Sequence, residues 1–127
     1  MSNTVPVLKN ADGQERIPTL WRRTLSDIVE AFKDQDFRLD RGVAGVRPIP
    51  VDDARRIAQN IENYGVHLTS LQEGTWQTSV CQWMRRYWGV LLDLYTVEEG
   101  ASDLVLAVRI YEEGSAYVFE VQSVYVP

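Results

Sequence analysis

The stretch TWQTSVCQWMRRYWGVLLDLYTVEEG, residues 75–100, decides the fold of this chain. Within this stretch and after it, apolar side chains recur at every second position, which is typical of β-strands. The alternation predicts four strands, at residues 76–84, 86–96, 103–112 and 116–126. Their connections are short and polar, so neighbouring strands are expected to pair as an antiparallel meander.

Two helices are expected before the strands. Large apolar side chains recur every three or four positions in residues 19–35 and again in residues 52–64, as in amphipathic helices. Thr19 is placed to cap the first helix, and Gly65 is placed to end the second in the left-handed conformation. Two helices followed by a run of strands predict an α+β fold, in which both helices pack on one face of a four-stranded antiparallel sheet.

The length of 127 residues fits a single domain with one core. Three parts are expected: a loosely ordered arm at residues 1–18, a helical half at residues 19–65 and a β-sheet half at residues 75–127. The chain shows no secretory signal and no apolar run long enough for a membrane helix. Its single cysteine fits a reducing compartment, so a cytoplasmic location is expected.

The net charge of −5 is unevenly distributed along the chain. Residues 1–64 hold ten acidic and ten basic side chains, whereas residues 65–127 hold eight acidic side chains and three arginines. An acidic surface repels phosphate backbones, so direct nucleic-acid binding is disfavoured and a basic protein partner is favoured. Moderate acidity also aids solubility without any partner, and both interpretations remain open.

Catalytic and metal-binding signatures are missing from the sequence. His67 is the only histidine and Cys81 the only cysteine, so the two would have to form any nucleophile pair. The alternation places Cys81 inside an apolar strand, where a thiol is commonly inert. No paired histidine, Cys-x-x-Cys or glycine-rich phosphate motif is present. The sequence therefore predicts a protein that is not an enzyme and has no catalytic residues, cofactor or metal.

Glu98 and Glu99 lie in the expected turn between the second and third strands, close to Asp103. The meander topology predicts that these carboxylates form an acidic end of the sheet without nearby bases. At the other end, residues 112–113 are expected to approach residues 85–86, which would neutralise them. The acidic end is the better candidate for partner recognition, although a merely solvated turn remains the alternative.

Trp76, Trp83 and Trp88 are too many for one buried sheet face. One or two of them are therefore expected at the rim or on the far face, where exposed aromatic rings often anchor protein partners. Trp76 and Trp83 are the candidate anchors. Alternatively, the N-terminal arm or the loop at residues 36–50 covers the rings.

The sequence also resembles a family of small bacterial domains of unknown function. The pattern is W-x-T-S-V-C-x-W at residues 76–83, Tyr-Trp at 87–88, D-L-x-T-x-E-E-G at 93–100 and S-D-L-V-L at 102–106, with VYVP at the C-terminus. The resemblance covers about half of the chain and implies no activity or catalytic residue. By size and acidity alone, the chain is also similar to immunity proteins of bacterial contact-dependent inhibition systems.

The leading hypothesis is a non-enzymatic immunity protein that binds and neutralises a cognate bacterial toxin. Nuclease toxins bind phosphates and tend to be basic, so an acidic inhibitor associates with them quickly. Two alternatives remain open. One is a small self-associating interaction or regulatory domain unrelated to toxins. The other is an unrecognised hydrolase, which would require His67 close to a nucleophile.

Overall fold

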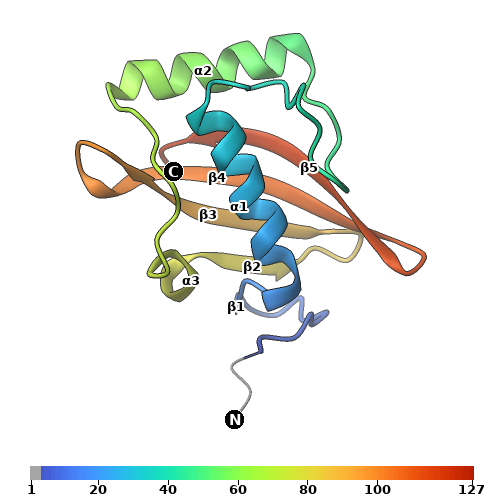
Figure 1. Cartoon of the computed structure of the whole chain (residues 1–127). Coiled ribbons are helices and arrows are strands. Elements are labelled where there is room, and N and C mark those ends of the chain that lie inside the picture. Colours follow the sequence, from blue (N-terminus) through green and yellow to red (C-terminus); the bar gives the residue numbers. More distant parts are fainter. Residues whose placement is uncertain (1–3) are drawn as a thin grey trace.

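Five antiparallel strands form a meander in which neighbours in the sheet follow chain order (Figure 1). The structure is a computed structural model that describes residues 4–127. The strands are β1 (Glu15–Arg16), β2 (Val80–Trp83), β3 (Trp88–Thr96), β4 (Gly100–Glu113) and β5 (Ala116–Tyr125). The helices are α1 (Thr19–Lys33), α2 (Val51–Tyr64) and α3 (Thr75–Thr78). The predicted α+β class and antiparallel pairing are confirmed, but the sheet has one strand more than expected.

Helix α1 covers one face of the sheet and forms the core with it (Figure 1). Its apolar stripe, including Trp21 and Phe32, is buried against the alternate residues of β3 and β4. Each fully buried side chain of this size stabilises the fold by about 1.5–3 kcal/mol. The helix ends at Lys33, two residues before the predicted end. The N-cap position is Pro18 rather than Thr19, whose hydroxyl accepts a hydrogen bond from Val5 N at 2.7 Å.

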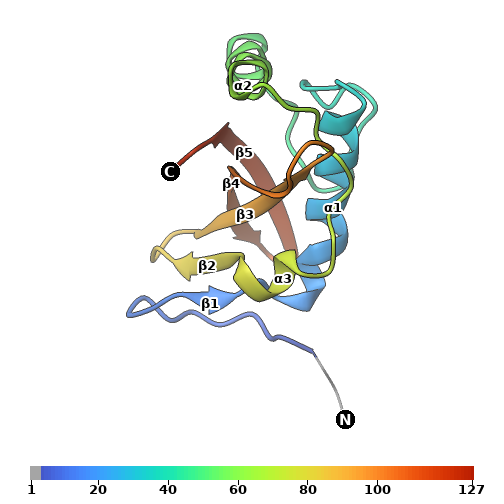
Figure 2. The same cartoon turned by 90° about the vertical axis from the view of Figure 1, so that its left-hand side faces the viewer.

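Helix α2 lies along the β5 edge of the sheet, and Figure 2 shows it above this edge while α1 lies on the face. Asn60 Nδ2 donates a hydrogen bond of 2.9 Å to the backbone oxygen of Val124 in β5. Phe119 of β5 also forms an isolated parallel bridge with Val46. Gly65 ends α2 with a φ of 84°, as the sequence predicts. The β5 edge is therefore protected from pairing with another strand.

The described part of the N-terminal arm is attached to the sheet, so the prediction of a loosely ordered arm is wrong for it. Strand β1 pairs with β2 and adds the fifth strand. Ile17 is fully buried, and Trp88 Nε1 donates a hydrogen bond of 2.9 Å to the backbone oxygen of Leu8. Two residues of strand carry too little alternation to be detected in the sequence. Residues 1–3 of the predicted arm lie outside the described residues.

The strand predicted from residue 76 begins only at Val80, because α3 occupies the preceding positions. Three hydroxyl contacts explain the difference. Thr75 Oγ1 donates to the backbone oxygen of Asp93 at 2.7 Å, Ser79 Oγ accepts from Asp93 N at 2.8 Å, and the two hydroxyls lie 2.9 Å apart. The side chains of Thr75 and Ser79 are buried and take the place of ladder hydrogen bonds to β3.

Candidate functional site

The acidic end predicted from the sequence is a turn held by the segment after α2. Leu68 forms an isolated antiparallel bridge with Thr96, the last residue of β3. Val97 N donates to the backbone oxygen of His67 at 2.9 Å. Glu99 N also donates to Thr96 Oγ1 at 3.0 Å. The turn between β3 and β4 is therefore fixed by hydrogen bonds on both sides.

Glu98 is tied to the same segment through its carboxylate. It accepts hydrogen bonds from the backbone N of His67 at 2.8 Å and from His67 Nδ1 at 2.7 Å. These hydrogen bonds, the side-chain one first, hold the pKa of Glu98 below its usual value. The expectation of an acidic end without a nearby base is therefore corrected, because His67 lies directly against Glu98. The two residues are 31 positions apart, so only the folded topology brings them together.

Glu99 and Asp103 share a partner in Tyr64, the last residue of α2. The Tyr64 hydroxyl accepts a hydrogen bond of 3.3 Å from Asp103 N. Its pKa is raised, mainly by the hydrogen bond to the Glu99 carboxylate. Asp103 is exposed and forms no ion pair within residues 4–127. Val97, beside the carboxylates at the tip, is 71% exposed and is the most exposed large apolar side chain described.

Neither tryptophan predicted as an anchor is freely exposed. Trp76 is only 6% exposed and lies beneath the Arg22 guanidinium, 5.1 Å from its ring centroid. Trp83 is half-buried, with its ring 4.5 Å from that of Trp88 and 5.3 Å from Lys9 Nζ. The prediction of an exposed Trp76 is therefore wrong. The alternative, cover by the N-terminal arm, holds for Trp83.

His67 and Cys81 do not form a nucleophile pair. Cys81 is buried in β2, where burial raises the pKa of its thiol to about 11. It lies opposite Val90, whereas His67 lies beside Thr96 and Val97 at the end of β3. Six residues of strand separate these positions, about 20 Å at about 3.3 Å per residue. The hydrolase alternative therefore loses the pair on which it depended.

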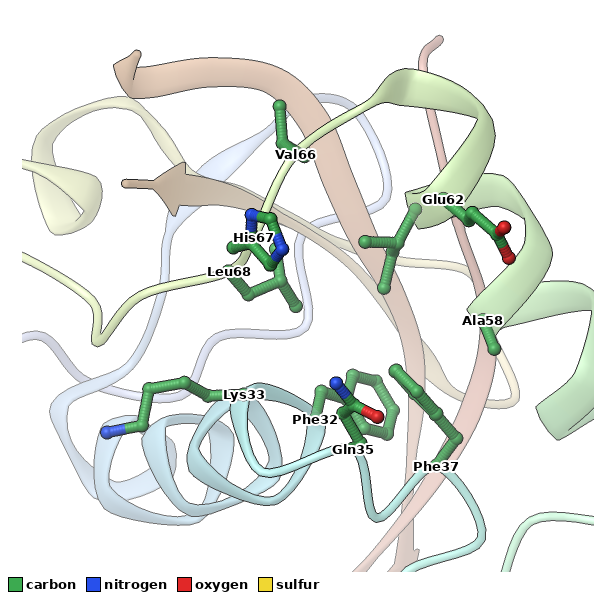
Figure 3. A pocket seen from close by; sticks show the side chains of 10 residues that line it. Phe32, Lys33, Gln35, Phe37, Ala58, Glu62, Val66, His67 and Leu68 are labelled. Carbon is green, nitrogen blue, oxygen red and sulfur yellow. The ribbon is translucent and has the colours of Figure 1, made fainter. Parts of the chain in front are cut away.

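A cleft of about 300 Å³ opens beside His67, between the end of α1, α2 and the segment after α2 (Figure 3). Its apolar walls include Phe32, Phe37 and Leu68, and Lys33 lies at its mouth. The Lys33 ammonium is already engaged, 2.9 Å from Glu30 Oε1 and 3.4 Å from Ser70 Oγ. Within residues 4–127, no group of three His, Cys, Asp or Glu side chains is placed to hold a metal.

The face of the sheet opposite α1 carries no helix in the described part of the chain (Figure 2). A hollow of about 350 Å³ lies on this face, lined by β2, β3, β4 and β5. The Arg109 guanidinium stacks over the ring of Tyr87 at 4.6 Å. No motif in the sequence points to this surface. In the sequence it corresponds only to the alternate strand residues that face away from α1.

A family model described as a domain of unknown function, DUF7668, matches residues 29–127. The chain belongs to this family. The match agrees with the predicted resemblance to a family of domains of unknown function. No curated protein and no solved structure matches the chain.

The DUF7668 match contains the acidic turn, Tyr64, His67 and all of β2 to β5. Strand β1 and the first two thirds of α1 lie before it. The arm that covers Trp83 is therefore outside the matched part, whereas both surfaces described above depend on elements within it. Within the described residues, no helix of the DUF7668 protein has the length and apolar character needed to cross a membrane.

Proposed function

We propose that this DUF7668 protein is a non-enzymatic inhibitor that binds a partner protein, and specifically an immunity protein that neutralises a cognate bacterial toxin. One observation supports the proposal most directly. The turn between β3 and β4 presents the exposed Val97 beside the carboxylates of Glu98, Glu99 and Asp103. An apolar side chain surrounded by like charges suits a partner with a basic rim around a small apolar pocket.

The turn is held by hydrogen bonds before any partner binds. His67 holds Glu98 through two hydrogen bonds, and Tyr64 bridges Glu99 and the backbone of Asp103. A surface that is already ordered loses little conformational entropy on association, so more of the contact energy appears as affinity. Its negative charge would also speed encounter with a basic nuclease-type toxin, and this steering weakens as salt is added.

The proposal is tested with the C-terminal domain of a large secreted protein encoded immediately upstream, where that gene has a toxin-like end. The two proteins are expected to co-purify. The charge reversals Glu99→Lys and Asp103→Lys should slow association and flatten its dependence on salt. Glu73→Lys is the matched control, because Glu73 is exposed but lies outside the turn. Equal effects at all three positions, or no complex at all, would contradict the proposal.

Self-association is the second candidate, and the helix-free face of the sheet is the observation that favours it. Pairing through sheet edges is disfavoured, because β1 is two residues long and α2 covers β5. A homo-oligomer would therefore have to use the face. Size-exclusion chromatography with light scattering separates the candidates. A stable dimer without partner supports self-association, and a monomer that forms a one-to-one complex supports the inhibitor.

A further inference from the structure

The hollow on the helix-free face has an apolar floor and an amphipathic rim. Val80, Leu91 and Ala107 form the floor, and they are cross-strand neighbours on β2, β3 and β4. Met84 and Tyr87 stand at the rim, from the turn between β2 and β3. Met84 is 48% exposed, although it is one of the largest apolar side chains on this surface. Methionine, tyrosine and arginine are enriched where proteins bind one another.

Arg109 lines this hollow, and three more arginines lie next to its lining residues in the strands or in the chain; we call the surface the arginine face. Arg16 is the cross-strand neighbour of Val80, Arg85 and Arg86 lie in the turn between β2 and β3, and Arg109 lies in β4. All four are exposed. Within residues 4–127, none of them forms an ion pair, whereas most other arginines do.

Three of the acidic side chains near this face are engaged elsewhere, whereas Asp93, two residues after Leu91 in β3, forms no ion pair within residues 4–127. Glu120 lies opposite Arg109 in the sheet, but its carboxylate is 2.6 Å from Arg47 Nη1. Glu112 is paired with Lys9 at 2.9 Å and Glu113 with Arg47 at 3.4 Å. Residues 112–113 do lie at the same end of the sheet as residues 85–86, because Trp88 pairs with Ile110 and the rings of Tyr87 and Tyr111 are 5.6 Å apart. The expected neutralisation by Arg85 and Arg86 is corrected, because Lys9 and Arg47 pair with the two carboxylates instead. The arginine face keeps a surplus of positive charge on a chain whose net charge is −5.

We propose that the arginine face binds an acidic segment of a partner protein. A large apolar side chain of that segment fills the hollow, and flanking carboxylates pair with the guanidinium groups. Guanidinium and carboxylate match in planar, two-pronged hydrogen bonds, which favours arginine over lysine at such a surface. This inference goes beyond the proposed function, because it uses a surface of opposite charge on a different part of the sheet.

Two other occupants fit less well. A second copy would have to offer its acidic turn, which follows the end of β3, whereas Arg85 and Arg86 precede the start of that strand. Such a contact between unlike surfaces also tends to form open chains rather than closed dimers. A nucleic acid would extend beyond the four arginines onto an acidic protein, where phosphates are repelled.

The test uses fluorescein-labelled twelve-residue peptides that alternate glutamate with small residues and carry one central phenylalanine. Matched peptides replace the glutamates by lysine, or the phenylalanine by serine, and an oligothymidylate of similar length forms a fourth probe. Binding is measured by fluorescence polarisation, and the site is mapped by amide chemical shifts. The glutamate–phenylalanine peptide is expected to bind in the micromolar to low millimolar range, to weaken as salt is added, and to shift residues of β2, β3 and β4.

Charge reversal identifies the surface. The double variant Arg16→Glu, Arg86→Glu should bind the glutamate–phenylalanine peptide about tenfold more weakly, or weaker still. Arg23→Glu combined with Arg55→Glu is the matched control, because both side chains are exposed on helices away from the hollow. The control should change affinity less than about threefold. Met84→Glu should also weaken binding, because it places a carboxylate at the rim of the hollow.

Several outcomes would overturn the inference. One is the absence of amide chemical shift changes with millimolar glutamate–phenylalanine peptide. Others are a lysine peptide that binds as tightly as the glutamate–phenylalanine peptide, and an oligothymidylate that binds more tightly than it. The last is a dimer that Arg86→Glu dissociates. Glu99→Lys should leave peptide affinity within about twofold, because the acidic turn is a separate surface. Peptide binding by Glu99→Lys therefore tests the arginine face separately from the proposed toxin-binding turn. A folded amide spectrum for each variant shows that lost binding is not lost structure.

Discussion

The hydroxyl network under α3 gives the sharpest test of how this sequence builds its sheet. Ser79 is 1% exposed, and its hydroxyl accepts from Asp93 N at 2.8 Å while lying 2.9 Å from Thr75 Oγ1. Ser79→Ala removes both contacts and leaves a buried N–H without a partner. An unsatisfied buried group costs about 1–3 kcal/mol, so we expect the free energy of unfolding to fall by about 2 kcal/mol.

Thr75→Val should have a similar effect through the other half of the network. Its hydroxyl donates to the Asp93 oxygen at 2.7 Å, so the substitution leaves a buried carbonyl unpaired. Ser79→Ala and Thr75→Val each break the hydrogen bond between the two hydroxyls. That bond is worth about 0.5–1.5 kcal/mol, so the double variant should lose about 1 kcal/mol less than the sum of the single losses.

Urea denaturation followed by tryptophan fluorescence measures these differences. With a slope of about 1–3 kcal/mol per M, each single substitution should lower the midpoint by about 1 M. Thr78→Ala is the matched control, because Thr78 is exposed and its hydroxyl makes only a 3.5 Å contact. It should change stability by less than about 0.5 kcal/mol. A loss below about 0.5 kcal/mol for Ser79→Ala, or strict additivity in the double variant, would refute the account of α3.

Three further predictions concern pH, reactivity and the sheet edge. His67 lowers the folded pKa of Glu98, so the contribution of Glu98 to stability is present above its unfolded pKa of about 4.5 and is lost as pH falls through the folded pKa. Glu98→Gln should therefore remove this pH dependence from the urea midpoints measured between about pH 6 and pH 3. A variant whose midpoints depend on pH as in the parent protein would contradict this prediction. Cys81, with a pKa of about 11, should react with a thiol reagent at neutral pH far more slowly in the folded protein than in urea, and equal rates would show that it is accessible. Asn60→Leu should cost about 1 kcal/mol, because the Val124 oxygen loses its partner, whereas exposed Gln59→Leu on the same helix should cost little in the same urea titration.

The regular parts of the fold were predictable because they depend on local periodicity. From Trp88 onward, alternation is strong and the turns are short, so the strands, their order and the buried face follow from sequence. The same rule fails at Trp76. There the alternation continues, but the Thr75 and Ser79 hydroxyls bond to β3, a long-range contact that no local pattern encodes. Strand β1 was missed because two residues carry no period.

The candidate site was predictable in its charges but not in its contacts. The meander topology was sufficient to place Glu98, Glu99 and Asp103 at one end of the sheet. It could not show that His67 lies against Glu98, because the segment after α2 has no periodicity and pairs with β3 through a single bridge. The surplus charge of the arginine face was missed for a related reason. Glu113 and Glu120 pair with Arg47, which lies more than 60 positions before them in the chain, so the sequence does not show that they are engaged away from this face.

The strand topology also separates the acidic turn from the arginines at the far end of the arginine face. The acidic turn follows the last residue of β3, and the turn that carries Arg85 and Arg86 precedes its first residue. Nine residues of strand separate the two ends, about 30 Å at about 3.3 Å per residue. This distance is several Debye lengths at physiological salt, where the Debye length is about 8 Å. Charge reversal at one end should therefore leave association at the other end unchanged, and a basic and an acidic partner should be able to bind the same molecule together.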